Sequence, residues 1–149
     1  MNIALGCDHA GVLLKNELIA YLADKKLSVI DKGAHSPDRV HYPVYAKLVA
    51  DAVVNKEADL GILICGSGIG VSIAANKVNG IRAAVCSEPY SARVSKEHND
   101  SNILAIGARV VGAELAKMIV DAWLDARFSG GVHQERIDML AAIEQGKRL

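Results

Sequence analysis

A cysteine followed by alternating glycines is the part of this sequence whose residue types most clearly suggest chemistry. Residues 60–70 read LGILICGSGIG, an apolar run that ends in Cys65 and opens into a loop. The loop consists of Gly66, Ser67, Gly68, Ile69 and Gly70. Its backbone N–H groups, at the start of a predicted helix, can bind an anion and favour a cysteine thiolate. Its glycines let a substrate approach the backbone closely. The segment therefore predicts chemistry on an anionic substrate.

The three cysteines are expected to differ in role. A free cysteine taken alone is more often a small buried hydrophobe than a reactive group. The glycine loop changes this expectation for Cys65, because its thiol is predicted to face backbone amides. Cys7 and Cys86 lack such a loop and are predicted to be structural. An odd number of cysteines in a chain that can bury a core favours reduced thiols over disulfides.

Short apolar runs alternate with longer helical patterns along the chain. The predicted strand and helix pairs are Asn2–Gly6 with Val12–Lys26, Ser28–Asp31 with Val44–Lys56, Leu60–Cys65 with Val71–Val78, Ile81–Ser87 with Ala92–Glu97, and Ile103–Gly107 with Ala113–Ala126. This alternation predicts an α/β fold, a single-domain, Rossmann-like, doubly wound five-stranded parallel sheet. The strands are continuous apolar runs, which is typical of strands covered on both faces.

The C-terminal segment differs from the rest. Residues 129–131, Ser-Gly-Gly, form the one linker-like break, and Gln134–Gln145 has apolar residues at helical spacing but little else to bury. We expect residues 129–149 to form a helical extension of one domain spanning 1–149. Its helix is predicted to pack on a partner subunit.

Polar residues gather near predicted strand ends, where open parallel sheets bind ligands. Asp8 and His9 follow the first strand, and Arg109 follows the fifth. His98–Asp100, just before the fifth strand, is placed in the same crevice. Alternatives remain open: Asp8 can simply cap a helix, and His98–Asp100 can be a helix-ending turn with Asn99 in the left-handed conformation.

Other charged residues carry weaker signals. His133 and Arg136 would share a helix face and could form a phosphate-binding patch, or simply a solvated face. Six further cations are interpreted as surface charge: Lys15, Lys25, Lys26, Lys56, Lys147 and Arg148.

The composition argues against several classes of protein. Lys plus Arg equal Asp plus Glu at 17 each, and no basic block is interleaved with aromatics, so nucleic-acid binding is not expected. No stretch approaches the ~20 apolar residues that span a bilayer, and the N-terminus has no basic leader. We therefore expect no membrane partner and a cytoplasmic location. The histidines are scattered and no CxxC occurs, so no metal site is predicted.

Five separated stretches, in order, resemble the ribose-5-phosphate isomerase B family. They are GCDHAG, DKGAHSPDRVHYPVYA, ICGSGIGVSIAANK, GIRAAVCSEPYSARVSKEHNDSNILAIGARVVG and HQERI. The wider group includes isomerases of allose 6-phosphate and galactose 6-phosphate. The resemblance implies an aldose–ketose isomerase of the pentose phosphate pathway that needs no metal or cofactor and converts ribose 5-phosphate to ribulose 5-phosphate. It also implies a homodimer, or a tetramer of two dimers, with active sites shared between subunits.

The resemblance implies roles for individual residues. Cys65 matches the base that moves a proton between C1 and C2 of the open-chain sugar. The charge of the resulting enediolate would be stabilised by the loop amides, Ser67 and Asn99. His98 resembles the ring-opening residue. The remaining matches are Asp8 and Tyr42 for sugar hydroxyls and His9, Arg109 and Arg136 for phosphate.

One position departs from the family pattern. Where the family commonly has an arginine after two glycines, this chain has Val132. The bidentate phosphate contact that an arginine makes is therefore missing. We expect a weaker hold on phosphate, a shifted preference such as one for allose 6-phosphate, or compensation by His133 or Arg109.

Three other classes are weighed against this interpretation. A dinucleotide site would need GxGxxG, and the glycines here are out of that register. A thiol phosphatase would need an arginine where Val71 stands, six positions after Cys65. The non-enzymatic alternative is a flavodoxin-like domain whose loop only holds phosphate or a nucleotide.

Overall fold

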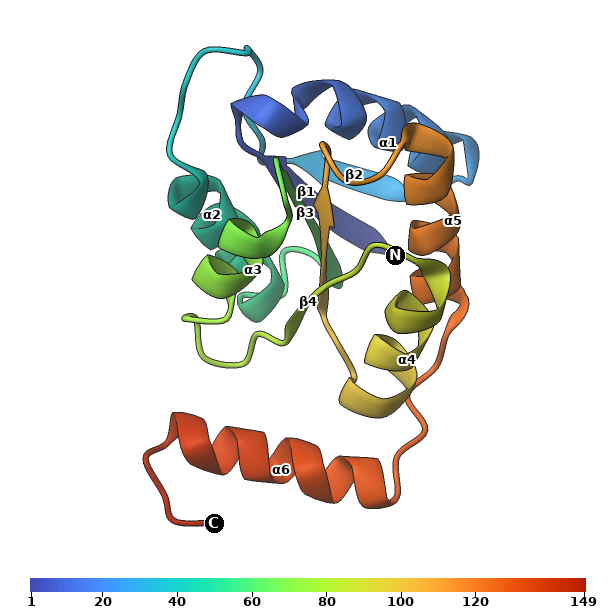
Figure 1. Ribbon diagram of the computed structural model, residues 1–149. Helices are drawn as coiled ribbons and strands as arrows, with labels where there is room; N and C mark the ends of the chain where they lie inside the picture. Colours follow the sequence, from blue (N-terminus) through green and yellow to red (C-terminus); the bar gives the residue numbers. More distant parts are fainter.

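The computed structural model describes residues 1–149 and contains one five-stranded, fully parallel sheet (Figure 1). The strand order is β2-β1-β3-β5-β4. The strands are β1 (Asn2–Cys7), β2 (Ser28–Asp31), β3 (Leu60–Cys65), β4 (Ala83–Val85) and β5 (Ile103–Gly107). The helices are η1 (His9–Gly11), α1 (Val12–Asp24), α2 (Tyr42–Val54), α3 (Ile69–Ala75), α4 (Pro89–Asn99), α5 (Ala113–Asp125) and α6 (Val132–Glu144). The predicted doubly wound, Rossmann-like α/β fold is confirmed.

Local backbone chemistry moves several boundaries away from their predicted positions. α3 begins at Ile69 because Gly68, with φ of 79°, turns the chain into the helix. α4 begins at Pro89, and the carboxylate of Glu88 caps it by accepting two backbone N–H groups of the first turn. β4 is shorter than predicted because only Ala83–Val85 pair with β5.

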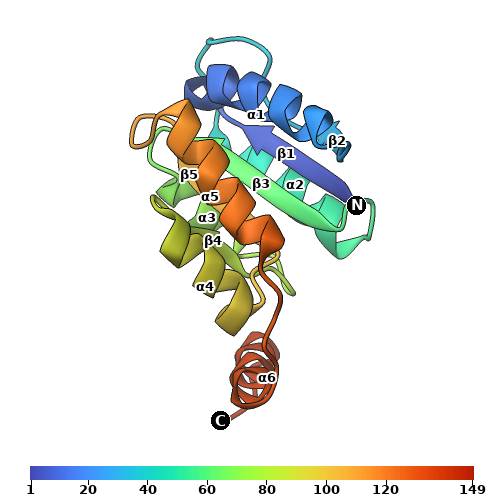
Figure 2. The same ribbon diagram turned by 90° about the vertical axis from the view of Figure 1, so that its right-hand side faces the viewer.

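Helices cover both faces of the sheet (Figure 2). α1, α4 and α5 lie on one face, where Leu18 and Leu22 of α1 and Trp123 of α5 are fully buried. α2 and α3 lie on the other face, where Val49 and Val71 are fully buried. The apolar strands are thus covered on both sides, as their sequence predicted. None of the helices combines the length and the apolar character needed to cross a bilayer.

Lys15 is not a surface charge, and that prediction is wrong. Its side chain is buried on α1, and its ammonium lies 2.7 Å from a carboxylate oxygen of Asp31 at the end of β2. A buried ammonium is tolerated because this carboxylate lies beside it. The other five cations of that set, Lys25, Lys26, Lys56, Lys147 and Arg148, are exposed as expected.

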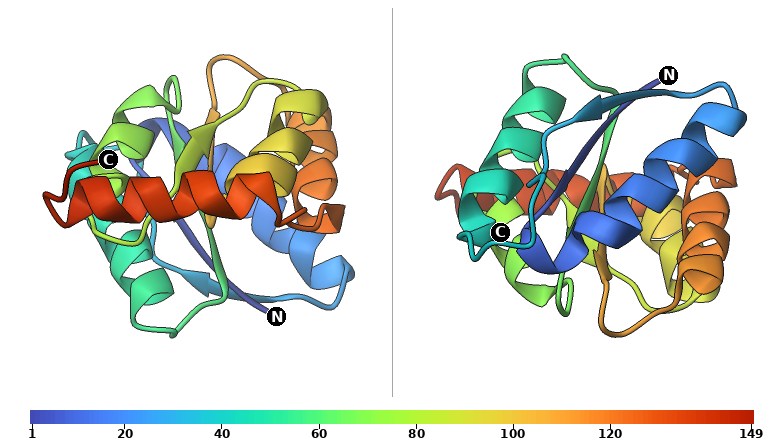
Figure 3. Two further views of the ribbon diagram at one scale, coloured as in Figure 1. Left: turned by 90° about the horizontal axis from the view of Figure 1, so that it is seen from below. Right: turned by 90° about the horizontal axis from the view of Figure 1, so that it is seen from above.

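α6 stands apart from the sheet, and none of its residues is buried. Seen from below, it crosses the end of the molecule from the α4 side toward α3 (Figure 3). The tether before it bends through Gly130 and Gly131, which have φ of 64° and 58°. At its start the Ser129 N–H donates to the carbonyl of Glu97 on α4, at 2.9 Å.

Candidate functional site

The carboxyl ends of β1, β3 and β5 meet at one edge of the sheet. Cys65, the last residue of β3, pairs with Gly107 of β5, and its neighbour Ile64 pairs with Cys7 of β1. The Asp8 N–H then donates to the carbonyl of Ile64, at 3.1 Å. The register therefore brings Asp8, Cys65 and the loop after β5 side by side, as expected for a ligand site in an open parallel sheet.

The sulfur of Cys65 is placed differently from the other two. All three cysteines are buried and free. The Cys65 Sγ accepts the N–H of Gly68 at 3.1 Å. By contrast, the thiols of Cys7 and Cys86 donate toward carbonyl oxygens, at 3.7 and 3.9 Å, and burial raises the pKa of each to about 11. Among the three, Cys65 is the one whose sulfur accepts a backbone N–H, a contact that stabilises a thiolate.

The three glycines of the loop differ in the space that they leave for a side chain. A Cβ at Gly68 would lie 2.9 Å from the backbone of Ile106, and its left-handed φ also disfavours other residues. A Cβ at Gly70 would lie 2.9 Å from the ring of Tyr42. A Cβ at Gly66 would lie 3.5 Å from the side chain of Arg109, which is an ordinary van der Waals contact. Gly68 and Gly70 therefore have to lack a side chain, whereas Gly66 has room for one.

A cavity of about 400 Å³ opens above this loop. Its lining residues are Tyr42, Cys65, Gly66, Ser67, Gly70, Arg109 and Val110. The Ile69 N–H donates to the Ser67 hydroxyl at 3.3 Å, and the Gly68 N–H donates to sulfur. The N–H groups of Gly66, Ser67 and Gly70 find no acceptor within the chain. These three amides can donate to a negatively charged oxygen in the cavity.

Asp8 and His9 lie beside this cavity, at the end of β1. Asp8 is buried, and its Oδ1 accepts the N–H of Ala10 at 2.9 Å, so it does cap the η1 turn. His9 Nδ1 accepts the backbone N–H of Val40 at 3.3 Å. Since the accepting Nδ1 carries no proton, this contact leaves Nε2 as the ring's hydrogen-bond donor. We call Asp8, His9, Tyr42, residues 65–70 and Arg109 the carboxyl-edge group.

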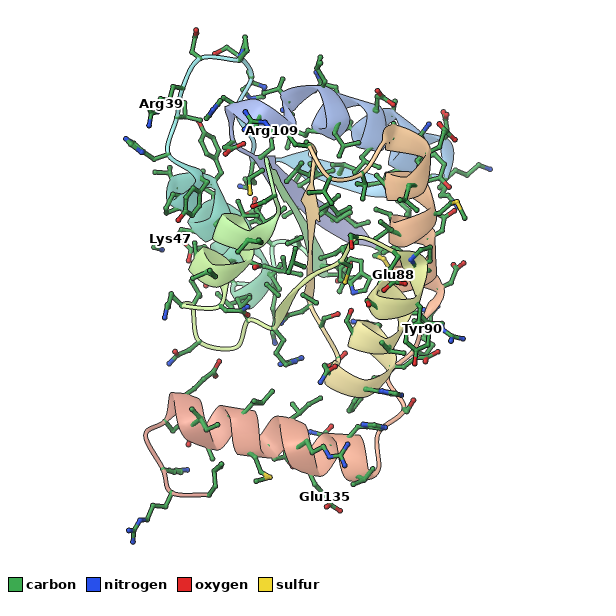
Figure 4. All side chains as sticks on the ribbon, in the orientation of Figure 1. Arg39, Lys47, Glu88, Tyr90, Arg109 and Glu135 are labelled. Atoms are coloured by element: carbon green, nitrogen blue, oxygen red, sulfur yellow. The ribbon has the colours of Figure 1, made fainter.

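Four other predicted site residues lie elsewhere, in what we call the helix-end group: His98, Asn99, His133 and Arg136. His98 and Asn99 end α4, and the other two lie in the first turns of α6. The rings of His98 and His133 stack with centroids 4.3 Å apart. In Figure 4, Arg109 of the carboxyl-edge group and Glu135 of α6 lie at opposite ends of the molecule.

The prediction that His98–Asp100 lies in the carboxyl-edge crevice of its own chain is therefore wrong. A helix that follows a parallel strand runs back along the sheet, so α4 ends at the edge where β5 begins. The left-handed residue of this turn is Asp100, with φ of 43°, rather than Asn99, which is the last residue of α4.

Two contributors to the site gave no sequence signal. Val110 lines the cavity, and the backbone N–H of Val40 orients His9. Both act through position or backbone rather than side-chain chemistry, so residue type could not identify them. The structure contains no cluster of three or more His, Cys, Asp or Glu side chains arranged to hold a metal ion.

Comparisons with known proteins agree with this fold. A family model described as Ribose/Galactose Isomerase matches residues 3–140. Ribose-5-phosphate isomerase B of Escherichia coli is 62% identical over 143 residues, 96% of each chain. A structure of ribose-5-phosphate isomerase B from Clostridium thermocellum has a TM-score of 0.97 at 53% identity, covering 98% of this chain and 99% of the other. The enzyme from Mycoplasma genitalium with bound ribulose-5-phosphate has a TM-score of 0.92 at 41% identity, covering 97% and 96%. The chain therefore belongs to the ribose-5-phosphate isomerase B family.

Proposed function

We propose that this protein interconverts ribose 5-phosphate and ribulose 5-phosphate. The observation that carries the proposal is the Cys65 sulfur, which accepts an N–H at the head of a cavity lined by unpaired amides and Arg109. The names of the relatives support the same reaction, and so does the ketose bound in the Mycoplasma genitalium structure.

The reaction follows from this arrangement as a proton transfer. The Cys65 thiolate takes the proton from C2 of the open-chain aldose and delivers a proton to C1, while the hydroxyl proton of O2 passes to O1 so that the carbonyl moves from C1 to C2. The enediolate formed in between carries negative charge on oxygen. The N–H groups of Gly66, Ser67 and Gly70 would donate to that oxygen, and one such donor is commonly worth about 10²–10³-fold in rate.

The other predicted roles belong to both groups of residues. In the carboxyl-edge group, Asp8 and Tyr42 would bind sugar hydroxyls. His9 and Arg109 of the same group would bind the phosphate. The helix-end group would supply His98 for ring opening, Asn99 for the enediolate and Arg136 for phosphate, with His133 stacked beside His98. Since the two groups lie at opposite ends of one chain, we propose a homodimer in which each site takes one group from each subunit.

Exposed apolar surface supports this assembly. Val44 and Leu48 of α2 and Ile69 and Ile73 of α3 are exposed next to the cysteine loop. A hollow of about 380 Å³ lies between α4 and α6 and includes Ile81, Leu140, Ile143 and Asn99 in its lining. Docking the α2–α3 face of one chain into this hollow of another would bring the helix-end group toward the partner's cavity. Pairing of two dimers, and the cytoplasmic location, stay predictions.

The experiment that tests the function compares two buried cysteines. Cys65→Ala is expected to lower the rate of ribose 5-phosphate isomerisation about 10³-fold, because it removes the general base. Cys86→Ala, the matched control, is expected to stay within about threefold because this buried thiol does not line the cavity. Wild-type turnover in D₂O is expected to bring deuterium into the sugar at C1 or C2.

Other outcomes would contradict the proposal. Full activity of Cys65→Ala would exclude the proton-transfer role. Tight binding of ribose 5-phosphate without any turnover would favour the non-enzymatic alternative. Since Val132 replaces a phosphate-binding arginine, the assay includes allose 6-phosphate, and a higher kcat/KM for the hexose would move the assignment to that sugar.

A further inference from the structure

The stacked pair of histidines at the junction of α4 and α6 is the feature that the proposed function leaves unexplained. The ring planes of His98 and His133 are tilted by only 5°, with centroids 4.3 Å apart. Two imidazolium rings in this arrangement repel each other, so the pair holds one proton far more readily than two. The location of that proton decides which ring can act as an acid.

The two rings lie at opposite ends of their helices. His98 is in the last turn of α4, where the helix dipole is negative and favours a cation. His133 is the second residue of α6, where the helix dipole is positive and disfavours one. Burial, followed by the charges of His98 and Arg136, lowers the pKa of His133 below its usual value. Of the other charged side chains at this end of α4, Arg82, Lys96 and Asp100 pair among themselves, while Glu97, next to His98, forms no salt bridge and adds negative charge beside that ring.

The tether holds the second ring against the first. The Ser129 N–H bonds to the carbonyl of Glu97, one residue before His98. The chain then turns through Gly130 and Gly131, and the His133 N–H donates to the carbonyl of Gly130 at 3.1 Å. The Ser129 contact thus holds the tether against the end of α4, and the two rings stack beside it.

We propose that His133 is a positioning residue for His98: its neutral ring supports the His98 ring face to face and leaves the pair's single proton on His98. The proposal rests on the proposed function and assigns His133 a role in ring opening instead of phosphate binding. In that step the C1–O4 bond of the furanose breaks and O4 takes the proton of His98. The anomeric hydroxyl loses its proton as the C1 carbonyl forms, and water returns that proton to His98.

The test uses two substrates that differ in the need for ring opening. Ribose 5-phosphate is a furanose in solution. Ribulose 5-phosphate cannot form that ring, because its 5-hydroxyl carries the phosphate. Initial rates are measured from each substrate over a wide range of enzyme concentration. Wild-type rates are expected to rise in proportion to enzyme from both.

His133→Ala is expected to separate the two directions. From ribulose 5-phosphate its rate stays proportional to enzyme and within about threefold of wild type, since the proton-transfer group is intact. From ribose 5-phosphate its rate falls about tenfold or more at high enzyme concentration, and it flattens because spontaneous ring opening becomes limiting. His133→Phe keeps a flat uncharged ring and is expected to behave as wild type. Gln134→Ala, on the same helical turn, is the control.

Each other result overturns the proposal. If His133→Ala lowers both rates in parallel, His133 binds substrate. If it changes neither rate, or if His133→Phe behaves as His133→Ala, ring support is not its role. If the wild type converts neither sugar, the proposed function itself has failed.

A titration of the wild-type protein labelled with ¹⁵N-histidine gives a readout that does not depend on activity or on any variant. As pH falls, the NMR signals are expected to show His98 gaining its proton while His133 stays neutral. A proton that appears first on His133 would contradict the assignment.

Discussion

The two groups of site residues are held by different kinds of structure. The carboxyl-edge group is anchored in the sheet and its core: Cys65 is buried, and Cβ atoms added at Gly68 or Gly70 would lie 2.9 Å from their neighbours. The helix-end group stands on exposed helix ends, and α6 buries none of its residues. Core packing and hydrogen bonds of the sheet edge fix the first group. The second is oriented by one tether, and the far end of α6 is held by the Glu144 carboxylate, which accepts the Gly80 N–H. A site made of both therefore combines a rigid base with an arm that a partner subunit would complete.

Mixing two inactive variants tests whether the two groups act across subunits, and it should give the largest effect. Cys65→Ala and His98→Asn are each expected to lose most of the ribose 5-phosphate activity. Refolding them together pairs an intact carboxyl-edge group with an intact helix-end group. Random pairing should then restore activity at about a quarter of the sites.

Mass spectrometry of the mixture would verify that hybrids form. If hybrids form and no activity returns, each site is built within one chain, and the comparison between the groups fails. Refolding each variant alone is the control.

Gly68→Ala probes the rigidity of the carboxyl-edge group. The new Cβ would lie 2.9 Å from the backbone of Ile106, so the loop must shift and the N–H contact to sulfur is disturbed. We expect kcat to fall roughly 10–100-fold. Gly80→Ala is the matched control, because Gly80 also has a positive φ, of 85°, but has room for a Cβ. It should cost stability only, about 1 kcal/mol.

The measurement is kcat together with the unfolding free energy from denaturant titration. Equal loss of kcat in both variants would mean that left-handed backbone strain, and not the position of this loop, accounts for the effect.

Val132→Arg, next to the helix-end group, should produce the smallest effect on the kinetics. Val132 is exposed at the start of α6, next to His133. A guanidinium there would add a charge-assisted phosphate contact, so KM for the sugar phosphate should fall about threefold to tenfold with kcat unchanged. Gln134→Arg, two positions along the same helix, controls for added charge. If KM for every sugar phosphate tested stays unchanged, position 132 is not part of the phosphate site.

The sequence predicted what depends on local patterns. Alternating apolar runs and helical spacing indicated all five strands, and the cysteine with its glycines identified the loop that lines the cavity. The sequence-based predictions failed where a contact between distant segments decides where a residue lies. The residues next to Lys15 in the sequence do not indicate that it is buried, because its carboxylate partner, Asp31, lies on another element. The prediction for His98 failed because a helix that follows a parallel strand runs back along the sheet, which puts the last turn of α4 at the opposite edge.

The paired left-handed glycines at 130 and 131 have a further consequence. Neither has an atom within 4 Å of where a Cβ would stand, so there is space for a side chain at both positions. Their positive φ angles are what favour glycine there. A single side chain there would redirect α6 and carry His133 and Arg136 with it, leaving the sheet and the cysteine loop untouched. In the proposed assembly, a substitution at either glycine would therefore change the contacts of the helix-end group to the sugar phosphate and leave the packing of the sheet unaltered.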